Sequence, residues 1–208
     1  EVVFSTAMTG YQEALTDPNY RGQILIQTFP MMGNYGVNSE DFTGSRCLLK
    51  GCIVREWCEA PSNFRSEGCI DQFLKEQGVI ALCGIDTRRL TALLRDKGTM
   101  NGMITTIENY NLEEILPELA AYRTGKVVEL VTCSEKEVLS GNKYKVALLD
   151  LGAKKNIAKS LNKRGCEVTV YPARTSAQEI LDTAPDGIML SNGPGDPKEC
   201  TEIIAEIR

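Results

Sequence analysis

Apolar runs alternate with helical segments between residues 145 and 190, and this alternation constrains the fold of the chain more than any other feature. Helices are predicted at Asn156–Arg164 and after the capping residue Ser176. The apolar runs predict strands at Lys145–Asp150, Glu167–Tyr171 and Gly187–Leu190. Strands that alternate with helices over such short intervals indicate an α/β fold with a doubly wound sheet of parallel strands.

The third of these strands runs into a loop with the sequence Ser191-Asn192-Gly193-Pro194-Gly195-Asp196-Pro197. Open α/β sheets bind small molecules at such loops, beyond the carboxyl ends of their strands. The tripeptide Gly193-Pro194-Gly195 is also compatible with an ordinary tight turn. The functional alternative is a backbone N–H donor that holds a developing oxyanion, since glycine lets a substrate lie against the main chain.

Residues 1–124 predict a separate domain that mixes strands and helices, with a turn-rich polar stretch at residues 9–13. Its predicted strands are Glu1–Phe4, Gln23–Phe29, Cys47–Glu56 and a buried strand at Val79–Cys83. Its predicted helices are Cys69–Gln77, one capped by Asp86 and ended by Gly98, and one capped by Asn111 that Pro117 should kink or split. Residues 125–144 are polar and predict a linker to the doubly wound domain at residues 145–208.

The net charge and the hydropathy of the chain argue against some classes of binding partner. A formal net charge of -5 argues against nucleic acid or an anionic membrane as the main partner. No apolar run reaches the length of a transmembrane helix, and no signal-peptide pattern stands at the amino terminus. We therefore expect a cytoplasmic protein without a membrane partner.

The chain offers few side chains for nucleophilic catalysis or for binding a metal ion. The eight cysteines form no Cys-x-x-Cys pair and the chain has no histidine, so we expect no metal site and reduced thiols that are buried as small apolar residues. Without histidine, residues 1–208 hold no complete Ser-His or Cys-His arrangement.

Several motifs resemble one enzyme family over nearly all of the chain. Leu190–Pro197 resembles the oxyanion loop of class I glutamine amidotransferases. The upstream motifs resemble the small, glutamine-hydrolysing subunit of carbamoyl-phosphate synthase; they are Phe4–Glu13, Leu15–Pro18, Gly22–Ile24, Gly33–Gly36, Ser62–Arg65, Ile85–Thr91, Leu94–Arg95 and Asp150–Ile157. By this resemblance, residues 1–124 form the small-subunit domain, residues 145–208 begin the amidotransferase domain, and the chain is truncated at both ends.

The resemblance also implies roles for three residues. Gly193 and Gly195 contact glutamine through the main chain, and Gly193 is favoured as the oxyanion donor. Asn19 stands where the family has a glutamine-binding serine after Thr-Asp-Pro; the alternative for Asn19 is an ordinary turn residue after Pro18. We expect Gly193→Val to abolish turnover while leaving the fold intact.

The family's nucleophilic cysteine and its His-x-Glu pair lie beyond Arg208 by the same resemblance. No catalytic side chain is therefore expected within residues 1–208, none of the present cysteines substitutes, and these residues alone are expected to be inactive.

The resemblance implies two partners, glutamine and a large synthetase subunit that forms a heterodimer with this one. The large subunit uses ATP and Mg²⁺ to make carbamoyl phosphate from bicarbonate, whereas this subunit binds no cofactor. The sequence does not decide whether the carbamoyl phosphate is used for arginine or for pyrimidine synthesis. It also does not decide whether the large subunit is a separate chain or is fused to this one. Two alternatives remain: another class I amidotransferase, serving GMP, CTP or anthranilate synthesis, and a non-catalytic amidotransferase-like binding module.

Overall fold

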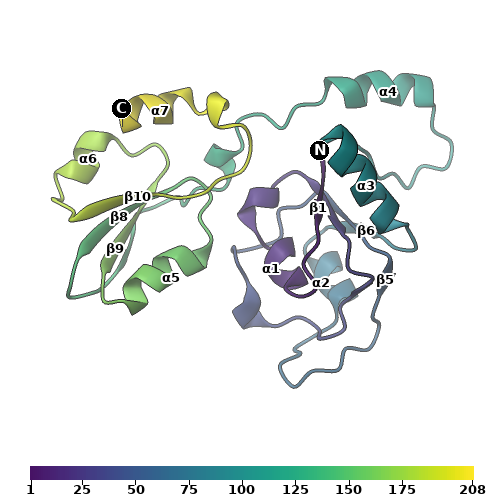
Figure 1. The fold of residues 1–208 in the computed structure, drawn as a ribbon, viewed down its shortest axis with the longest axis horizontal. Coiled ribbons are helices and arrows are strands. Elements are labelled where there is room, and N and C mark those ends of the chain that lie inside the picture. Colours follow the sequence, from purple (N-terminus) through teal and green to yellow (C-terminus); the bar gives the residue numbers. More distant parts are fainter. The chain divides into compact units, whose positions relative to one another are not determined.

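The computed structural model describes residues Glu1–Arg208 in full, and they form two compact units (Figure 1). The first unit is Glu1–Thr124 and the second is Gly125–Arg208. Each unit builds its own four-stranded sheet.

The sheet of the first unit has the strand order β1-β2-β4-β6, and all of its strands are parallel. Its strands are β1 (Val2–Ser5), β2 (Ile24–Gln27), β4 (Gly51–Ile53) and β6 (Ile80–Leu82). Two short strands, β3 (Met31–Met32) and β5 (Glu56–Trp57), pair beside it. The helices are α1 (Tyr11–Leu15), α2 (Ile70–Glu76), α3 (Thr87–Lys97) and α4 (Leu112–Ala121), with the short 3₁₀ helices η1 (Pro18–Tyr20) and η2 (Ser39–Asp41).

Helices cover both faces of this parallel sheet. Leu25 and Cys52 face one side, where they pack with residues of α1 and α2. Ile24, Ile26 and Ile53 face the other side, where Leu94 of α3 packs against them. Alternation along each strand produces these two faces, because successive side chains point to opposite sides of a sheet.

The sheet of the second unit has the order β10-β8-β9-β7. Its strands are β7 (Glu137–Leu139), β8 (Lys145–Asp150), β9 (Glu167–Pro172) and β10 (Gly187–Leu190). Strands β8, β9 and β10 are parallel, and β7 is antiparallel to β9. The helices are α5 (Lys155–Lys163), α6 (Ala177–Leu181) and α7 (Thr201–Ile207), with the 3₁₀ helices η3 (Val128–Leu130) and η4 (Pro197–Glu199).

Helices lie on both faces of this sheet as well, with α5 on one side and α6 and α7 on the other (Figure 1). Ala158 of α5 packs with Leu148 and Val168. Ile180 of α6 and Ile203 of α7 belong to the core on the opposite face. The prediction of an α/β fold with a doubly wound parallel sheet is confirmed.

The predicted helix caps form as expected. Asp86 accepts the N–H of Arg89 at 3.0 Å, Asn111 accepts that of Glu113 at 3.0 Å, and Ser176 accepts that of Glu179 at 3.2 Å. Each cap satisfies a backbone donor that the first turn of a helix leaves unpaired.

Other segments differ from their predictions. Residues 125–144, predicted as a linker, belong to the second unit and contribute β7 and η3 to it. Residues 9–13, predicted as turn, include the start of α1. The N–H groups of Tyr11 and of the preceding residue Gly10 donate to the hydroxyl of Tyr35. The strand predicted at Cys47–Glu56 is confined to β4 and the start of β5, and α4 runs unbroken through Pro117.

The prediction of a strand at Val79–Cys83 is confirmed by β6, but the prediction that it is buried is wrong. All three residues of β6 are exposed. Strand β6 is an edge strand with only β4 as a neighbour. No helix anywhere in the structure combines the length and the apolar character needed to cross a membrane.

Candidate functional site

The candidate site lies at the carboxyl edge of the second sheet, where the loops after β8 and β10 meet. Ser191 follows β10, and its hydroxyl accepts the backbone N–H of Leu151 at 2.8 Å. The N–H of Ser191 donates to the carbonyl of Leu149 at 3.1 Å and so extends the pairing of the two strands. These bonds tie the loop after β10 to the turn after β8.

Asp150 organises the turn after β8. Its buried carboxylate accepts the N–H groups of Gly152 at 2.9 Å and Ala153 at 2.7 Å through Oδ1. Its Oδ2 accepts the N–H of Cys133 at 2.6 Å. A buried carboxylate with three backbone donors holds its surroundings firmly, because hydrogen bonds to a charged acceptor are the strong ones.

Thr132 joins the ends of two strands. Its hydroxyl donates to the carbonyl of Asp150 at 2.6 Å and accepts the N–H of Ala173, just after β9, at 2.8 Å. The segment predicted as a linker therefore forms part of the carboxyl edge at which the candidate site stands.

We call residues 191–197 the glycine loop. Its central residue packs against this edge, and its two glycines are exposed. Pro194 is buried, whereas Gly193 and Gly195 are exposed. A Cβ placed on Gly152 would lie 2.8 Å from Cδ of Pro194, so the two turns pack closely. The backbone N–H groups of Gly193 and Gly195 donate no hydrogen bond within residues 1–208. The loop therefore has two exposed residues whose backbone donors are unpaired.

Gly193 is required for a reason that the sequence did not reveal. A Cβ on Gly193 would lie closer than 3.0 Å to the carbonyl oxygen of Leu151, which is backbone and cannot rotate away. The expectation that Gly193→Val leaves the fold intact is therefore wrong, since the added atoms meet the turn after β8 before they meet any ligand. Gly195 has a φ of +81°, and a Cβ there would lie 2.7 Å from Cγ2 of Val127.

Asn19 belongs to the first unit, in the 3₁₀ helix η1. Its Nδ2 donates to Oδ1 of Asp17 at 2.6 Å, and its backbone N–H donates to the same oxygen at 3.0 Å. Asp17 thus fixes the direction of the Asn19 amide. The structure brings Gly193 and Gly195 together in one loop, whereas Asn19 lies in the other unit.

A buried polar network holds the segment that leads to Asn19. The amide of Gln12 bonds both the N–H of Asn38 at 2.9 Å and its carbonyl at 2.5 Å. The hydroxyl of Thr16 donates to the carbonyl of Gln12 at 2.8 Å and accepts the N–H of Thr43 at 3.0 Å. Gln12 and Thr16 are fully buried and hydrogen-bonded, so they fix this segment in a single conformation.

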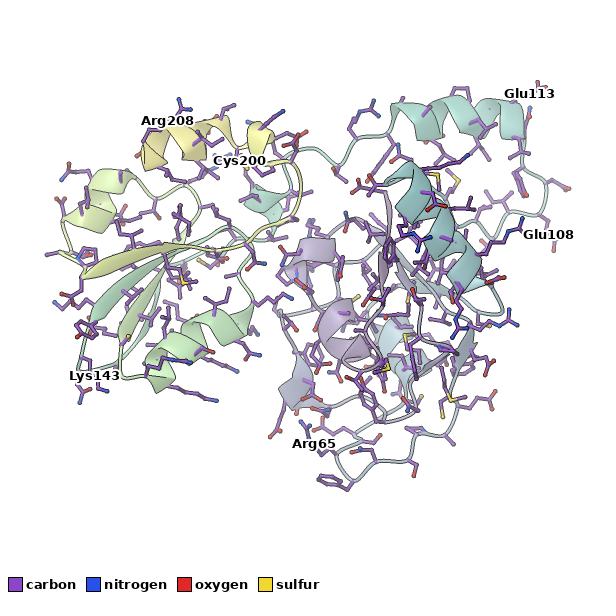
Figure 2. The ribbon with its side chains drawn as sticks, in the orientation of Figure 1. Arg65, Glu108, Glu113, Lys143, Cys200 and Arg208 are labelled. Atoms are coloured by element: carbon purple, nitrogen blue, oxygen red, sulfur yellow. The ribbon has the colours of Figure 1, made fainter.

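The cysteines near the glycine loop are poor nucleophiles. Burial and the nearby Asp150 raise the pKa of Cys133 to about 11. Burial, followed by the charge of Glu199, raises the pKa of Cys200, which stands at the start of α7 (Figure 2). A thiol must lose its proton to attack, so both are held in the less reactive form at neutral pH. All eight cysteines are free, but only Cys47 and Cys52 are buried. The expectation that the cysteines are buried as small apolar residues is therefore wrong for the other six, of which Cys83 is exposed.

Two family models match the chain. The model described as carbamoyl-phosphate synthase small chain, CPSase domain, matches residues 1–104, and the model described as glutamine amidotransferase class-I matches residues 147–208. The first match covers half of the chain. The chain belongs to the carbamoyl-phosphate synthase small-chain family.

Curated members of this small-chain family align with the whole chain. The carbamoyl phosphate synthase small chains of Clostridium perfringens, Listeria monocytogenes serotype 4b and Fusobacterium nucleatum are 48%, 49% and 46% identical to it. Each alignment covers 100% of this chain but only 59%, 57% and 58% of the respective relative. The chain thus spans less than three fifths of the length of these relatives.

The small-chain family match does not by itself reveal the residues that hold the glycine loop. Asp150 and Ser191 were not singled out as site residues from the sequence. A polar residue at the carboxyl end of an apolar strand is the signal that both share, because Asp150 ends β8 and Ser191 follows β10, which places both at the binding edge of the sheet.

Proposed function

We propose that the chain is part of the glutamine-hydrolysing subunit of a carbamoyl-phosphate synthase. The observation that carries the proposal is the loop after β10, where the exposed residues Gly193 and Gly195 have unpaired N–H groups. Donors that are fixed in advance stabilise an oxyanion well, because they need no reorganisation when the charge develops. The names of the curated relatives support the same assignment.

In the proposed reaction, a cysteine thiolate attacks the side-chain amide carbon of glutamine. The carbonyl oxygen becomes an oxyanion and accepts the backbone N–H of Gly193. The intermediate collapses with loss of ammonia, and water then cleaves the glutamyl thioester to release glutamate. By the family resemblance, the thiolate and its base come from outside residues 1–208. In support, these residues contain no histidine, and burial raises the pKa of Cys133 and Cys200.

Three residues bind glutamine in this proposal. Gly193 and Gly195 contact it through the main chain, and the Asn19 amide, held by Asp17, hydrogen-bonds its α-carboxylate or α-amine. This chain binds no cofactor or metal. ATP and Mg²⁺ are used by a large subunit, which receives the ammonia and makes carbamoyl phosphate from bicarbonate in the cytoplasm. An enclosed route for ammonia fits this coupling, because ammonia that reached bulk water would be protonated.

The test uses the full-length protein purified with its large subunit. With glutamine, bicarbonate and ATP we expect glutamate and carbamoyl phosphate to form together, and residues 1–208 alone to release no glutamate. Glutamate release by purified residues 1–208, with contaminating enzymes excluded, would show that the nucleophile is wrongly assigned.

The same assay separates the alternatives. Formation of GMP, CTP or anthranilate by the full-length protein with the matching synthase would place it in another class I amidotransferase. No glutamine hydrolysis under any of these conditions would leave a binding module.

A further inference from the structure

Asn101 and Asn192 are each followed by glycine in the sequence, and the structure holds their side chains in different ways. The amide of Asn101 donates to the backbone carbonyl of Leu119 at 2.7 Å and to that of Tyr122 at 3.1 Å. Asn192 lies in the glycine loop, is exposed, and makes no hydrogen bond through its side-chain amide. The side chain of Asn101 is therefore fixed, whereas that of Asn192 is free to rotate.

The backbone beside the Asn192 side chain is open to reaction. The next nitrogen belongs to Gly193, which is exposed, donates no hydrogen bond and has no Cβ to hinder a close approach. The hydroxyl of Ser191 donates to the carbonyl of Asn192 at 2.7 Å, in the same peptide group as this nitrogen. A hydrogen bond at that oxygen draws electron density from the nitrogen, so the N–H loses its proton more easily.

We propose that Asn192 is a site of spontaneous deamidation. The N–H of Gly193 loses its proton to a base in the solvent, and the nitrogen attacks Cγ of Asn192 to close a five-membered succinimide ring. The C–N bond of the side-chain amide breaks, and the departing nitrogen takes up a proton and leaves as ammonia. Water then opens the ring at either carbonyl, which gives aspartate or isoaspartate. The reaction requires no cofactor and no second protein.

The modification alters the backbone donor of the glycine loop. The nitrogen of a succinimide carries no hydrogen, so the Gly193 donor is absent while the ring is closed. Either product places a carboxylate next to this donor, and isoaspartate also adds one methylene to the main chain. A negative charge at this position opposes the formation of an oxyanion beside it. This effect on activity rests on the proposed function, whereas the modification itself does not.

Polypeptide outside residues 1–208 has to be included in the test, because the curated relatives are longer than this chain. The two reacting groups belong to consecutive residues, Asn192 and Gly193. Further polypeptide therefore acts on the reaction only by covering these residues or by holding the asparagine side chain. Comparison of the folded and unfolded full-length protein measures that effect directly.

The experiment incubates the full-length protein at pH 7 and pH 8 and follows each asparagine by mass spectrometry after digestion, as a gain of about 1 Da. Asn192 should convert about tenfold faster than Asn101, because two hydrogen bonds must break before Asn101 reacts. The rate at Asn192 should rise about tenfold per pH unit, since the attacking nitrogen must first lose its proton. In urea the two asparagines should convert at similar rates.

Asn192→Gln is the matched control, because glutamine keeps the amide but would have to close a six-membered ring, so residue 192 should keep its mass. Equal rates at Asn192 and Asn101 in the folded protein would overturn the inference. It would also be overturned if Asn192 stays intact in the folded protein and converts only in urea. The second result would mean that polypeptide outside residues 1–208 covers or holds the side chain.

Glutamate release with the large subunit present separates this inference from the proposed function. If Gly193 is the oxyanion donor, wild-type activity should fall in proportion to the conversion of Asn192, and Asn192→Gln should keep its own starting activity. Conversion without loss of activity would contradict the role of Gly193 and leave the modification site standing. No glutamate release by fresh protein would overturn the proposed function, and the mass measurement would still decide the modification.

Discussion

The hydroxyl of Ser191 and the backbone N–H of Leu151 are joined by a hydrogen bond of 2.8 Å, which connects the ends of two neighbouring parallel strands. Gly193 packs against the carbonyl of the same Leu151. One residue of the turn after β8 thus contacts the loop after β10 through both its donor and its acceptor. The position of the Gly193 N–H group is therefore set by the core of the sheet rather than by the loop alone.

Gly193→Ala should destabilise the full-length protein by about 1–3 kcal/mol, because its Cβ would overlap the Leu151 carbonyl and the backbone must shift. Glutaminase activity should fall with it. Urea unfolding measures the first effect and glutamate release the second. Gly187→Ala is the control, since nothing lies within 4 Å of a Cβ there, and its stability should change by no more than about 0.5 kcal/mol. Wild-type stability in Gly193→Ala would contradict the packing argument.

Asp150→Asn should cost about 2 kcal/mol or more of stability, because the neutral amide weakens three bonds from backbone donors to a buried carboxylate. The N–H groups of Cys133, Gly152 and Ala153 should also exchange with solvent faster. Hydrogen exchange at these three amides checks the prediction. Asp96→Asn, whose side chain is 67% exposed, should show neither effect.

Asn19→Ala in the full-length enzyme should raise the KM for glutamine about tenfold and leave kcat within twofold, as expected for loss of one ground-state hydrogen bond to the substrate. Asn19→Ser keeps a polar group at this position and should recover most of the affinity. Steady-state kinetics with varied glutamine measure both. Equal KM values for wild type and Asn19→Ala would leave Asn19 with only its local bond to Asp17.

The rate of thiol alkylation should be lower for a cysteine that is buried and whose pKa is raised. Burial raises the pKa of Cys52 to about 12 and, together with Asp150, that of Cys133 to about 11. A raised pKa keeps the thiol protonated, so at pH 8 both should react with iodoacetamide far more slowly than the exposed Cys83, and the rate at Cys133 should rise about tenfold per pH unit up to pH 10. Mass spectrometry after timed labelling measures the rates. Unfolding in urea should equalise them, and fast native labelling of Cys52 would contradict its burial.

Features that depend on near neighbours in the sequence were predictable. The caps at Asp86, Asn111 and Ser176 act within two or three residues, and all three form. The parallel strands of the second sheet were predictable for the same reason, since each is a continuous apolar run between helix signals.

Features that depend on distant residues were not predictable. The N–H groups at the start of α1 are satisfied by Tyr35, which lies 24 and 25 residues further along the chain. Strand β7 is a short segment within a charged stretch, and only its pairing with β9 gives it a regular conformation. Gly193 could be identified as a site residue, but the reason it must be glycine is the Leu151 carbonyl, which the chain reaches only after folding.

Strand β10 pairs with β8 on one side only, and Ile188, Met189 and Leu190 along it are all exposed. An open row of backbone donors and acceptors beside apolar side chains is a template for strand addition between molecules. If residues 1–208 are expressed alone, the exposed edge of β10 should therefore limit their solubility. Ile188→Lys should delay aggregation in concentrated samples.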